Sequence, residues 1–400
     1  MRRNCFKQSN EVVIVDKPLI WAEIDLNAYA HNIKELRRIT HPSARLMAVV
    51  KANGYGHGAA EVAREALQNG AEWLGVARIN EAIQLRQEGL AAPILILGYT
   101  PPDLADKLID FDLTATVYSR ATAEILSSKA QSRGKTIGIH IKVDSGMGRL
   151  GLLPDALISR TASPDLKNEA VREIELISKL PGLEIEGIFT HFATADSADK
   201  SYANKQLDIF LDFINQLRRA GLEPPLKHAA NSAALLELKE SHLDMVRPGI
   251  ATYGLSPSDE ITKMDVALKP VMALKSRIIQ IKNVPAGFNV SYGITHQTQH
   301  PTTIATVPVG YADGFNRLLS SRGNMLVHGK KVPIVGRVCM DLTMLDVGNL
   351  SDINLEDEVV IFGPQGDQSI TADEIASRLN TVNYEIVSTI TARVPRVYIR

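Results

Sequence analysis

The 400-residue chain has only two cysteines, Cys5 and Cys339, and they lie far apart in the sequence. Two such cysteines cannot provide the disulfide framework of a small secreted protein. The sequence also lacks the Cys-x-x-Cys and His-x-Glu spacings that are typical of zinc sites. We therefore expect no metal ion and a cytoplasmic location.

A surplus of one charge and a long apolar run are also missing. The 44 Lys and Arg residues balance 45 Asp and Glu residues, whereas a nucleic-acid binder normally carries a basic surplus or stripe. No apolar run approaches the roughly 20 residues that span a bilayer. The stretch VVIV near the N-terminus is too short for the core of a signal peptide. We expect neither a nucleic acid nor a membrane as partner, and residues 1–16 are predicted to be an N-terminal extension.

What the chain does contain is a regular alternation of short apolar runs and helix-type segments. Apolar residues make up 45% of it and charged residues 22%, which is typical of a folded globular protein. Segments such as AAEVAREALQNG carry apolar residues with helical spacing and end at Gly. They alternate with eight runs of β-strand composition, at 45–51, 72–77, 93–98, 113–117, 138–144, 184–191, 226–231 and 244–250. This α/β pattern predicts a TIM (β/α)8 barrel, with a doubly wound open sheet as the alternative.

After about residue 260 the chain becomes rich in β-type segments, for example TTIATVPVG and DEVVIFG, with Gly and Pro at short intervals. Such a change indicates a separate, mainly β domain. We therefore predict a barrel domain at 17–262 and a C-terminal β domain at 263–400. Residues 159–168 are predicted to form a surface insertion after the fifth barrel strand.

The most informative string is VVKANGYGHG, in which Lys51 stands at the end of the first barrel strand and before a glycine-rich turn. TIM barrels place their catalytic residues at the carboxyl ends of the strands. The string closely resembles the lysine motif of the fold-type III alanine racemases, which binds pyridoxal 5'-phosphate (PLP). From about Trp21 onward, further strings resemble the same family in the same order: KVDSGMGRLG, THFATAD, HAANSAA, VRPGIATYG, VSYGITH, VGYADGFNR, GRVCMD and NYEIVSTITARVPR.

The resemblance implies a two-base interconversion of L-alanine and D-alanine. Lys51 would hold PLP as a Schiff base and, once substrate has released it, would act as one base. Tyr292, in VSYGITH, matches the second base on the opposite face of the substrate. The D-alanine of such enzymes usually supplies peptidoglycan synthesis, although catabolic racemases share the motifs.

Three further residues are expected beside the cofactor ring. Arg247, near the end of the eighth strand, matches the arginine that faces the pyridine nitrogen. Because a guanidinium only donates hydrogen bonds, that nitrogen would stay unprotonated. The resemblance also implies that His191 hydrogen-bonds Arg247, and that Arg149 lies near the phenolic oxygen of the cofactor and the substrate carboxylate.

The cofactor phosphate is expected after the seventh and eighth strands, the usual phosphate site of a TIM barrel. The Ser232 hydroxyl follows Asn231 at the start of a predicted helix and suits a dianion. The backbone N–H groups of Gly249 and Ile250 are further donors. By resemblance, two tyrosines complete this phosphate shell, Tyr55 and Tyr384.

The β domain is expected to complete the active site of a partner chain, because in the family the second base comes from the other subunit of a homodimer. Met340 and Tyr384 are expected to wall a substrate pocket that admits little more than a methyl group, with Tyr292 opposite. By resemblance, four residues line the entrance to this pocket, namely Asp196, Tyr311, Arg317 and Arg337.

Lys142 is a candidate for carbamylation, because some family members carry this modification in the same string. A carbamate would turn the cation into an anion that orients Arg149. The alternative is an ordinary lysine that pairs with Asp144 or with solvent.

Other functions stay open from the residues alone. GMGRLG fits the G-x-G-x-x-G pattern of dinucleotide binding, but no second strand with an acidic tip follows about 20 residues on. A PLP-dependent decarboxylase of basic amino acids would use Cys339 as proton donor, although GRVCMD matches the racemase string. A non-catalytic PLP-binding barrel would not need the β domain. Racemisation of serine or of several amino acids would share all of the chemistry.

Overall fold

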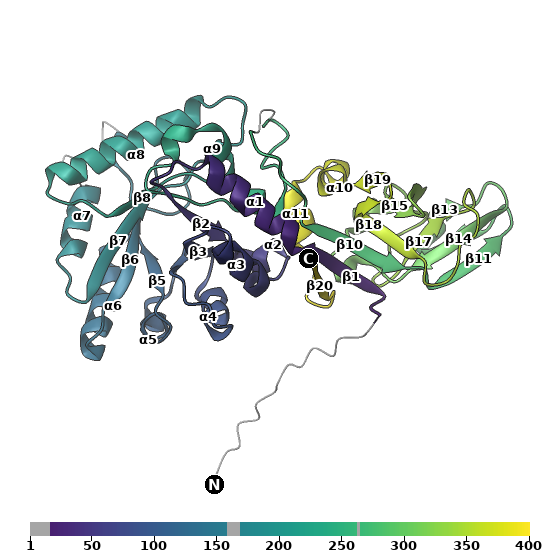
Figure 1. The fold of residues 1–400 in the computed structure, drawn as a ribbon, viewed down its shortest axis with the longest axis horizontal. Coiled ribbons are helices and arrows are strands. Elements are labelled where there is room, and N and C mark those ends of the chain that lie inside the picture. The colour runs from purple at the N-terminus through teal and green to yellow at the C-terminus, as the bar shows by residue number, and fades with distance from the viewer. Residues whose placement is uncertain (1–16, 158–168, 262–264) are drawn as a thin grey trace, which may run out of the picture. The chain divides into compact units, whose positions relative to one another are not determined.

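The chain forms two compact units in a computed structural model that describes residues 17–157, 169–261 and 265–400 (Figure 1). The barrel unit comprises residues 23–273, 372–390 and 398–400. The β unit comprises residues 17–22, 274–371 and 391–397. The predicted extension and the predicted insertion, at 1–16 and 159–168, lie outside the described residues.

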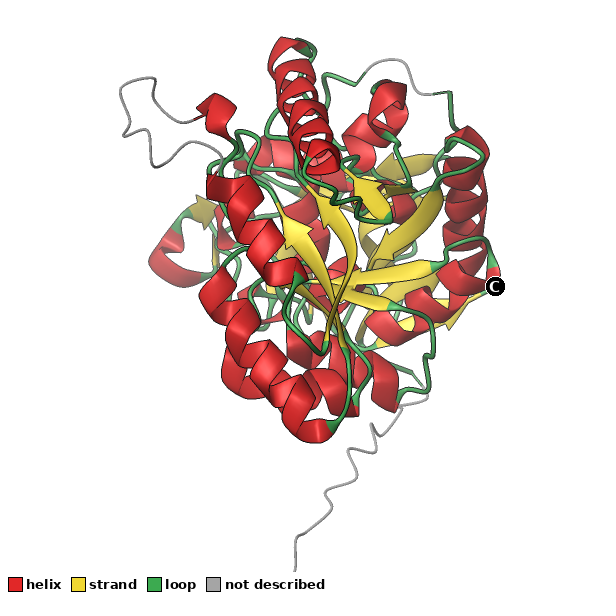
Figure 2. Ribbon diagram, turned by 90° about the vertical axis from the view of Figure 1, so that its left-hand side faces the viewer, coloured by secondary structure: helices red, strands yellow, loops and turns green. Residues whose placement is uncertain are grey.

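Parallel strands form the centre of the barrel unit (Figure 2). There are eight of them in the described residues: β2 (Arg45–Val49), β3 (Trp73–Val76), β4 (Ile94–Ile96), β5 (Thr114–Val117), β6 (Ile137–Lys142), β7 (Leu183–Phe189), β8 (Leu226–His228) and β9 (Met245–Val246). They are hydrogen-bonded in the order β8-β7-β6-β5-β4-β3-β2-β9. Two backbone bonds join the ends of this order, from Asp244 N to Lys227 O at 3.0 Å and from Arg247 N to Ala230 O at 3.0 Å. The predicted barrel is confirmed, and the open-sheet alternative is wrong.

Helices surround the strands because their apolar faces pack on the outside of the sheet. They are α1 (Leu26–Ile39), α3 (Ala59–Gln68), α4 (Ile79–Gln87), α5 (Ala105–Asp110), α6 (Arg120–Arg133), α7 (Glu169–Ser178), α8 (Ser201–Arg219) and α9 (Ser232–Glu237). The caps follow the sequence. Asp25 accepts the Ala28 N–H at 2.8 Å at the start of α1, and α6 ends at Gly134 in the left-handed region, with φ 58°.

Two late helices, α10 (Ala372–Leu379) and α11 (Asn383–Ser388), belong to the barrel unit although the β unit precedes them in the chain. The Asn383 side chain donates to Ser256 O at 2.8 Å and to Asp373 Oδ1 at 2.6 Å. The helix α11 also approaches the first barrel loop closely, since a Cβ on Gly56 would lie 2.2 Å from Val387 O. These contacts hold Tyr384 beside the barrel strands.

The β unit is mainly β, as the C-terminal sequence predicted. Its largest sheet has the order β16-β15-β18-β10-β1-β20, with β19 on β18, and contains β1 (Ile20–Asp25), β10 (Met272–Arg277), β15 (Asn324–Val327), β16 (Lys330–Pro333), β18 (Glu358–Gln365), β19 (Gln368–Ile370) and β20 (Arg396–Ile399). Two smaller sheets contain β11 (Gln280–Val284), β14 (Thr302–Val307) and β17 (Thr343–Asp346), and β12 (Asn289–Val290) and β13 (His296–Gln297). Pairs such as β10 with β18 and β11 with β14 are antiparallel. Val284, Val290, Ile304 and Val335 form one buried cluster of this unit.

Candidate active site

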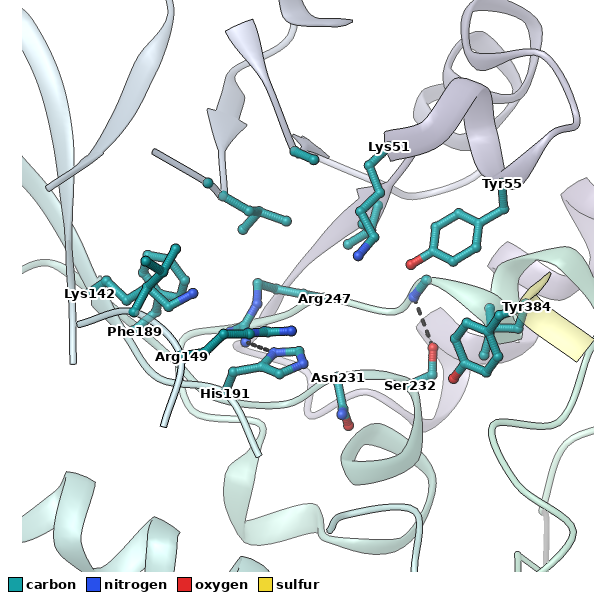
Figure 3. A pocket seen from close by; sticks show the side chains of 17 residues that line it. Lys51, Tyr55, Lys142, Arg149, Phe189, His191, Asn231, Ser232, Arg247 and Tyr384 are labelled. Atoms are coloured by element: carbon teal, nitrogen blue, oxygen red, sulfur yellow. Dashed lines mark hydrogen bonds between the residues drawn. The ribbon is translucent and has the colours of Figure 1, made fainter. Parts of the chain in front are cut away.

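A pocket of about 340 Å³ opens at the carboxyl ends of the barrel strands (Figure 3). Its size is typical of a small-molecule site. The pocket brings together eleven residues that the sequence pointed to: Lys51, Tyr55, Lys142, Arg149, His191, Asn231, Ser232, Arg247, Gly249, Ile250 and Tyr384. Apolar side chains, among them Val49, Leu97, Leu150 and Phe189, fill the wall between them. No carboxylate lies among the described residues that line it.

Lys51 begins α2 (Lys51–Tyr55), which is a left-handed turn rather than an ordinary helix. The φ angles of Ala52, Asn53, Gly54 and Tyr55 are 53°, 55°, 61° and 50°. L-residues in this region cost roughly 1–2 kcal/mol each, so the surrounding structure must impose the conformation. The Asn53 side chain accepts the Ala59 N–H at 3.0 Å and ties the turn to α3.

Glu81, in the first turn of α4, holds the start of this turn in place. Its Oε1 accepts the Ala52 N–H at 2.6 Å, and its Oε2 accepts the Ala77 and Arg78 N–H groups at 2.8 and 2.9 Å. One carboxylate therefore joins the loop after β2 to the loop after β3. Burial and the charge of Arg149 lower the pKa of Lys51, and the charge of Glu81 partly opposes them. Lys51 is thus poised to lose its proton more readily than an ordinary lysine.

Lys142, at the end of β6, is buried and lies 5.0 Å from the centroid of the Phe189 ring. Burial, followed by the nearby charges of Arg149 and Arg247, lowers the pKa of Lys142 to about 8. Together with Lys51, the side chains of Lys142, Arg149 and Arg247 give the pocket a positive charge. Such a pocket favours an anionic ligand.

Asp144 organises the glycine-rich loop that carries Arg149. Its Oδ1 accepts the N–H groups of Gly146, Met147 and Gly148 at 2.9, 2.8 and 3.1 Å, and its Oδ2 accepts the Arg149 N–H at 3.0 Å. Burial raises the pKa of this carboxyl, but the four backbone donors outweigh burial and bring the pKa below its usual value. The GMGRLG string therefore wraps around a carboxylate, which fits an arginine-presenting loop and not a dinucleotide-binding one.

Arg247 follows β9 and is buried, so the orientation of its guanidinium is determined by hydrogen bonds. Its Nη2 donates to Thr190 O at 2.8 Å and to Ala229 O at 3.0 Å, and lies 3.4 Å from His191 Nδ1. Burial lowers the pKa of Arg247 to about 9. Burial, and then the charge of Arg247, holds the pKa of His191 well below its usual range, so His191 is a neutral imidazole beside a cation.

Sequence reasoning did not single out two residues that support this site, His228 and Glu81. His228 Nδ1 accepts from Arg247 Nη1 at 2.9 Å, and its ring stacks on Phe189 with 4.9 Å between centroids. It lies inside the HAANSAA string, where only Asn231 and Ser232 were selected. For Glu81, an acidic residue in the first turn of a helix after a barrel strand was the available signal.

At the opposite end of the pocket, Ser232 is surrounded by tyrosines and backbone N–H groups. Its hydroxyl accepts the Gly249 N–H at 2.9 Å and the Ala251 N–H at 3.3 Å, so the expected Gly249 donor is already used within the protein. Tyr55 and Tyr384 lie 6.2 Å apart between ring centroids, and burial raises the pKa of both phenols. Gly249 is required here, because a Cβ on it would lie 2.4 Å from the Tyr55 hydroxyl.

The remaining predicted residues lie outside this pocket. Asp196 follows β7 in the barrel unit and is exposed, with its charge adding to the raised pKa of Tyr384. The others belong to the β unit: Tyr292, Tyr311, Arg317, Arg337 and Met340.

Neighbouring loops gather the five residues of the β unit. Ser291 Oγ donates to Arg337 O at 2.6 Å, the Tyr311 N–H donates to Cys339 O at 3.1 Å, and Ser320, beside Arg317, accepts the Val338 N–H at 3.0 Å. Tyr292 is 70% exposed and Met340 52% exposed, so this edge of the unit presents large side chains to solvent. Ser291 has φ 65° and Ile294 φ 50°, a strained conformation that marks functional loops.

Two features are absent from the described ranges. No group of three or more His, Cys, Asp or Glu side chains is placed to hold a metal ion there. None of the helices in the same ranges combines the length and the apolar character that crossing a membrane requires.

Comparison with known proteins matches most of the chain to one family. The family profile "Alanine racemase, N-terminal domain" matches residues 24–257, and "Alanine racemase, C-terminal domain" matches residues 271–398. The alanine racemase of Desulfosudis oleivorans is 56% identical over 378 residues, which is 94% of this chain and 96% of that protein.

Solved structures agree with the sequence comparison. An alanine racemase from Clostridium difficile 630 is 41% identical, with a TM-score of 0.89 and 96% of each chain covered. A histidine racemase from Leuconostoc mesenteroides is 28% identical, with a TM-score of 0.86 over 96% of this chain and 99% of that one. The chain belongs to the alanine racemase family and is therefore an amino-acid racemase.

Proposed function

We propose that the enzyme is a PLP-dependent racemase that interconverts L-alanine and D-alanine by two bases, Lys51 and Tyr292, and supplies D-alanine for peptidoglycan in the cytoplasm. The observation that carries the proposal is the pocket itself. A half-buried lysine with a lowered pKa, Lys51, lies in a positively charged cavity at the carboxyl ends of barrel strands. Family membership supplies alanine as the first substrate to test.

The donor set of the pocket fits PLP at both ends. Lys51 Nζ lies 5.8 Å from the centroid of the Tyr55 ring, so the amine and the Ser232 end belong to one cavity. Ser232, Tyr55 and Tyr384 offer hydroxyl groups for a phosphate. Arg247, directly after β9, presents a donor-only guanidinium toward the pocket. A flat, dianionic ring compound with one aldehyde therefore suits these residues.

Bound PLP would supply an electron sink for the Cα–H bond of the amino acid. The protein residues would do the rest. Arg247 would keep the ring nitrogen free of a proton, because its guanidinium has donors only. Its orientation is held by the bonds of Nη2 to Thr190 and Ala229 and of Nη1 to His228. This arrangement favours transfer of a single proton over side reactions.

Racemisation needs one base on each face of the substrate. Lys51 would hold or move the proton at Cα on one face, and burial keeps its amine ready for this role. Tyr292 would act on the other face. Since Tyr292 belongs to the β unit and is exposed on it, we propose that it reaches the pocket of a second chain in a homodimer. Tyr311, Arg317, Arg337 and the barrel residue Asp196 would then line the entrance.

We propose that the substrate is selected by Arg149 and by two side chains that wall the pocket. Arg149 lines the pocket and would bind the substrate carboxylate. Met340 of the partner and Tyr384 would leave room for a methyl side chain. One methylene or hydroxyl changes the discrimination by only about 1–3 kcal/mol, so alanine has to be tested against larger substrates.

The test loads the purified enzyme with PLP and measures racemisation of a panel that contains alanine, serine, lysine and histidine, with and without the cofactor. We expect racemisation of alanine to require PLP and to exceed that of the others. Borohydride treatment followed by peptide mapping should leave a pyridoxyl group on Lys51. Activity without PLP, a label on another lysine, or release of carbon dioxide from basic amino acids would contradict the proposal.

A further inference from the structure

A chain of polar side chains runs from Arg247 down through the barrel interior. Arg247 Nη1 lies 2.9 Å from His228 Nδ1, and His228 Nε2 lies 2.8 Å from His140 Nδ1. Arg247 directly follows β9, His228 belongs to β8 and His140 to β6, and all three are buried. The interior of a TIM barrel is normally filled by branched apolar side chains, so a polar chain there needs an explanation.

The proton positions in this chain follow from Arg247. A guanidinium has no acceptor, so His228 Nδ1 must be the acceptor in the first bond. Neutral His228 then carries its proton on Nε2 and donates it to His140 Nδ1. His140 in turn carries its proton on Nε2. Burial, and then the charge of Arg247, lowers the pKa of His140 to about 3 and that of His228 well below its usual range, so both rings are neutral.

The chain ends at Glu186 on β7. His140 Nε2 is buried with no hydrogen-bond partner among the described residues, and the nearest carboxylate oxygen, Glu186 Oε2, lies 3.9 Å away. Glu186 Oε2 accepts from Thr114 Oγ1 on β5 at 2.9 Å, which fixes the carboxylate beside the ring. Burial raises the pKa of the Glu186 carboxyl, and the Thr114 hydroxyl opposes this rise. The charges of Glu184, on the same strand, and Asp112, before β5, add to the rise in pKa.

Two glycines make room for these side chains. A Cβ on Gly138 would lie 2.4 Å from Glu186 Oε1, and a Cβ on Gly187 would lie 2.7 Å from His140 Cε1. Each glycine belongs to a strand that has branched apolar residues elsewhere, Gly138 to β6 and Gly187 to β7. The strands are thus shaped around the polar chain rather than filled with apolar volume.

We propose that Glu186 is a positioning residue for Arg247, acting through His140 and His228. The Glu186 carboxylate lies 3.9 Å from His140 Nε2, beyond a direct hydrogen bond, and its negative charge attracts the Nε2 proton of His140. This attraction reinforces the tautomers that Arg247 imposes and keeps Nδ1 of His228 turned toward the guanidinium. Arg247 is thereby held in one orientation at the top of the barrel by an anion at the bottom. The functional part of this inference rests on the proposed role of Arg247 in the active site.

The first test reads the proton positions directly and does not depend on activity. The full-length enzyme is labelled with ¹⁵N-histidine, and the ring nitrogens of His140 and His228 are assigned by NMR with a Gln variant of each. We expect both rings to be neutral and protonated on Nε2. A proton on Nδ1 of either ring would overturn the proposal, whether or not the enzyme racemises alanine.

The second test compares Glu186→Gln with Glu184→Gln, which removes the same charge two residues away on the same strand. Glu186→Gln should move the His140 Nε2–H resonance and lower kcat by about three- to tenfold with KM little changed, the range for coupling through a side-chain network. Glu184→Gln should leave the His140 resonance in place and kcat and KM within about twofold of those of the unmodified enzyme. Glu186→Asp, which keeps the charge, should recover part of the loss.

Three results would overturn the proposal. They are an unmoved His140 resonance in Glu186→Gln, an unchanged kcat in that variant, and equal effects of the two Gln variants. If Glu186→Gln does not fold, Glu186→Asp takes its place, and the His140 resonance must then move in that variant.

Discussion

At the scale of single residues, Lys142 shows how burial changes chemistry. Its amine lies among cations, and its pKa is lowered to about 8. The charge of Asp144 only partly opposes this lowering, and its carboxylate also accepts four backbone N–H groups of the Arg149 loop. Cations thus predominate around the Lys142 amine. An anion in place of the ammonium would relieve the repulsion with Arg149 and Arg247.

We predict that Lys142 is carbamylated. The neutral amine attacks carbon dioxide, a C–N bond forms, and one proton leaves to solvent. Because an ordinary lysine stays protonated until about pH 10, Lys142 should react already between pH 7 and 9. ¹³C NMR in ¹³C-bicarbonate should show one carbamate signal that Lys142→Met removes, and KM for alanine should rise about tenfold in that variant. No signal at pH 8 would contradict the prediction.

Glu81 is the second residue whose effect can be measured. Replacing it by Gln places an NH₂ group against backbone N–H donors of Ala52, Ala77 or Arg78. We expect Glu81→Gln to lower the free energy of unfolding by about 1–3 kcal/mol and to lower kcat, because Lys51 starts the turn that Glu81 holds. Urea unfolding and initial rates measure the two effects.

Glu88→Gln is the matched control for Glu81→Gln. Glu88 follows the same helix and pairs with Arg64 at 2.9 Å on the surface, where an ion pair contributes only about 0–1 kcal/mol. Equal losses of stability and kcat in the two variants would show that Glu81 has no special role.

At the scale of elements, the left-handed turn α2 and the late helix α11 form one assembly. Gly56 lies at their closest approach, with φ 87° and room for no side chain. Gly56→Ala should therefore combine backbone strain with a clash against Val387 O and cost more than about 3 kcal/mol of stability. Displacing α11 also moves Tyr384, so the affinity for PLP, measured by absorbance titration, should fall.

Gly89→Ala distinguishes backbone strain from the clash with Val387 O. Gly89 has φ 82°, but a Cβ there would meet nothing within 4 Å. It should cost only the conformational strain of about 1–2 kcal/mol and leave the affinity for PLP unchanged. If Gly56→Ala and Gly89→Ala lower the free energy of unfolding equally, the close approach of α11 to Gly56 does not contribute to stability.

The same elements show what the sequence could and could not predict. Each of the eight predicted strands was found, because buried parallel strands are continuous apolar runs that local composition reveals. The strand order of the β unit was not predictable, since its pairings join residues far apart, such as Leu274 with Phe362. Local patterns also do not reveal that α10 and α11 belong to the barrel unit.

The candidate active site also contains residues that the sequence could predict and residues that it could not. Residues inside distinctive strings, such as Lys51 and Arg149, could be selected from the sequence and were brought together in the pocket. Glu81, His140 and Glu186 could not, because their importance lies in contacts with backbone groups and buried rings of other strands. Apart from the position of Glu81 in the first turn of a helix, nothing in their own neighbourhood distinguishes them from ordinary surface or core residues.

At the scale of the whole molecule, the proposed homodimer predicts a specific complementation. Lys51→Ala and Tyr292→Ala are each expected to be inactive. In a mixed dimer one site would lack both bases and the other would have both. Random reassembly of the two variants in equal amounts makes half of the dimers mixed, each with one intact site, so about a quarter of the full activity should return.

Either inactive variant reassembled alone is the control for this mixture. If each site came from a single chain, every site would stay damaged and the mixture would remain inactive. Sedimentation of the reassembled protein must show dimers in both cases for the comparison to hold.

The placement of Tyr384 has a consequence for how the enzyme is made. The last barrel strand, β9, ends at Val246, but α11, which carries Tyr384 into the pocket, follows only after the whole of 274–371. On the ribosome, all eight barrel strands therefore emerge well before the pocket is complete. A nascent chain can close its barrel early, yet it gains its full set of cofactor contacts only near the end of translation. Capture of PLP would then act as a final step that favours finished chains over truncated ones.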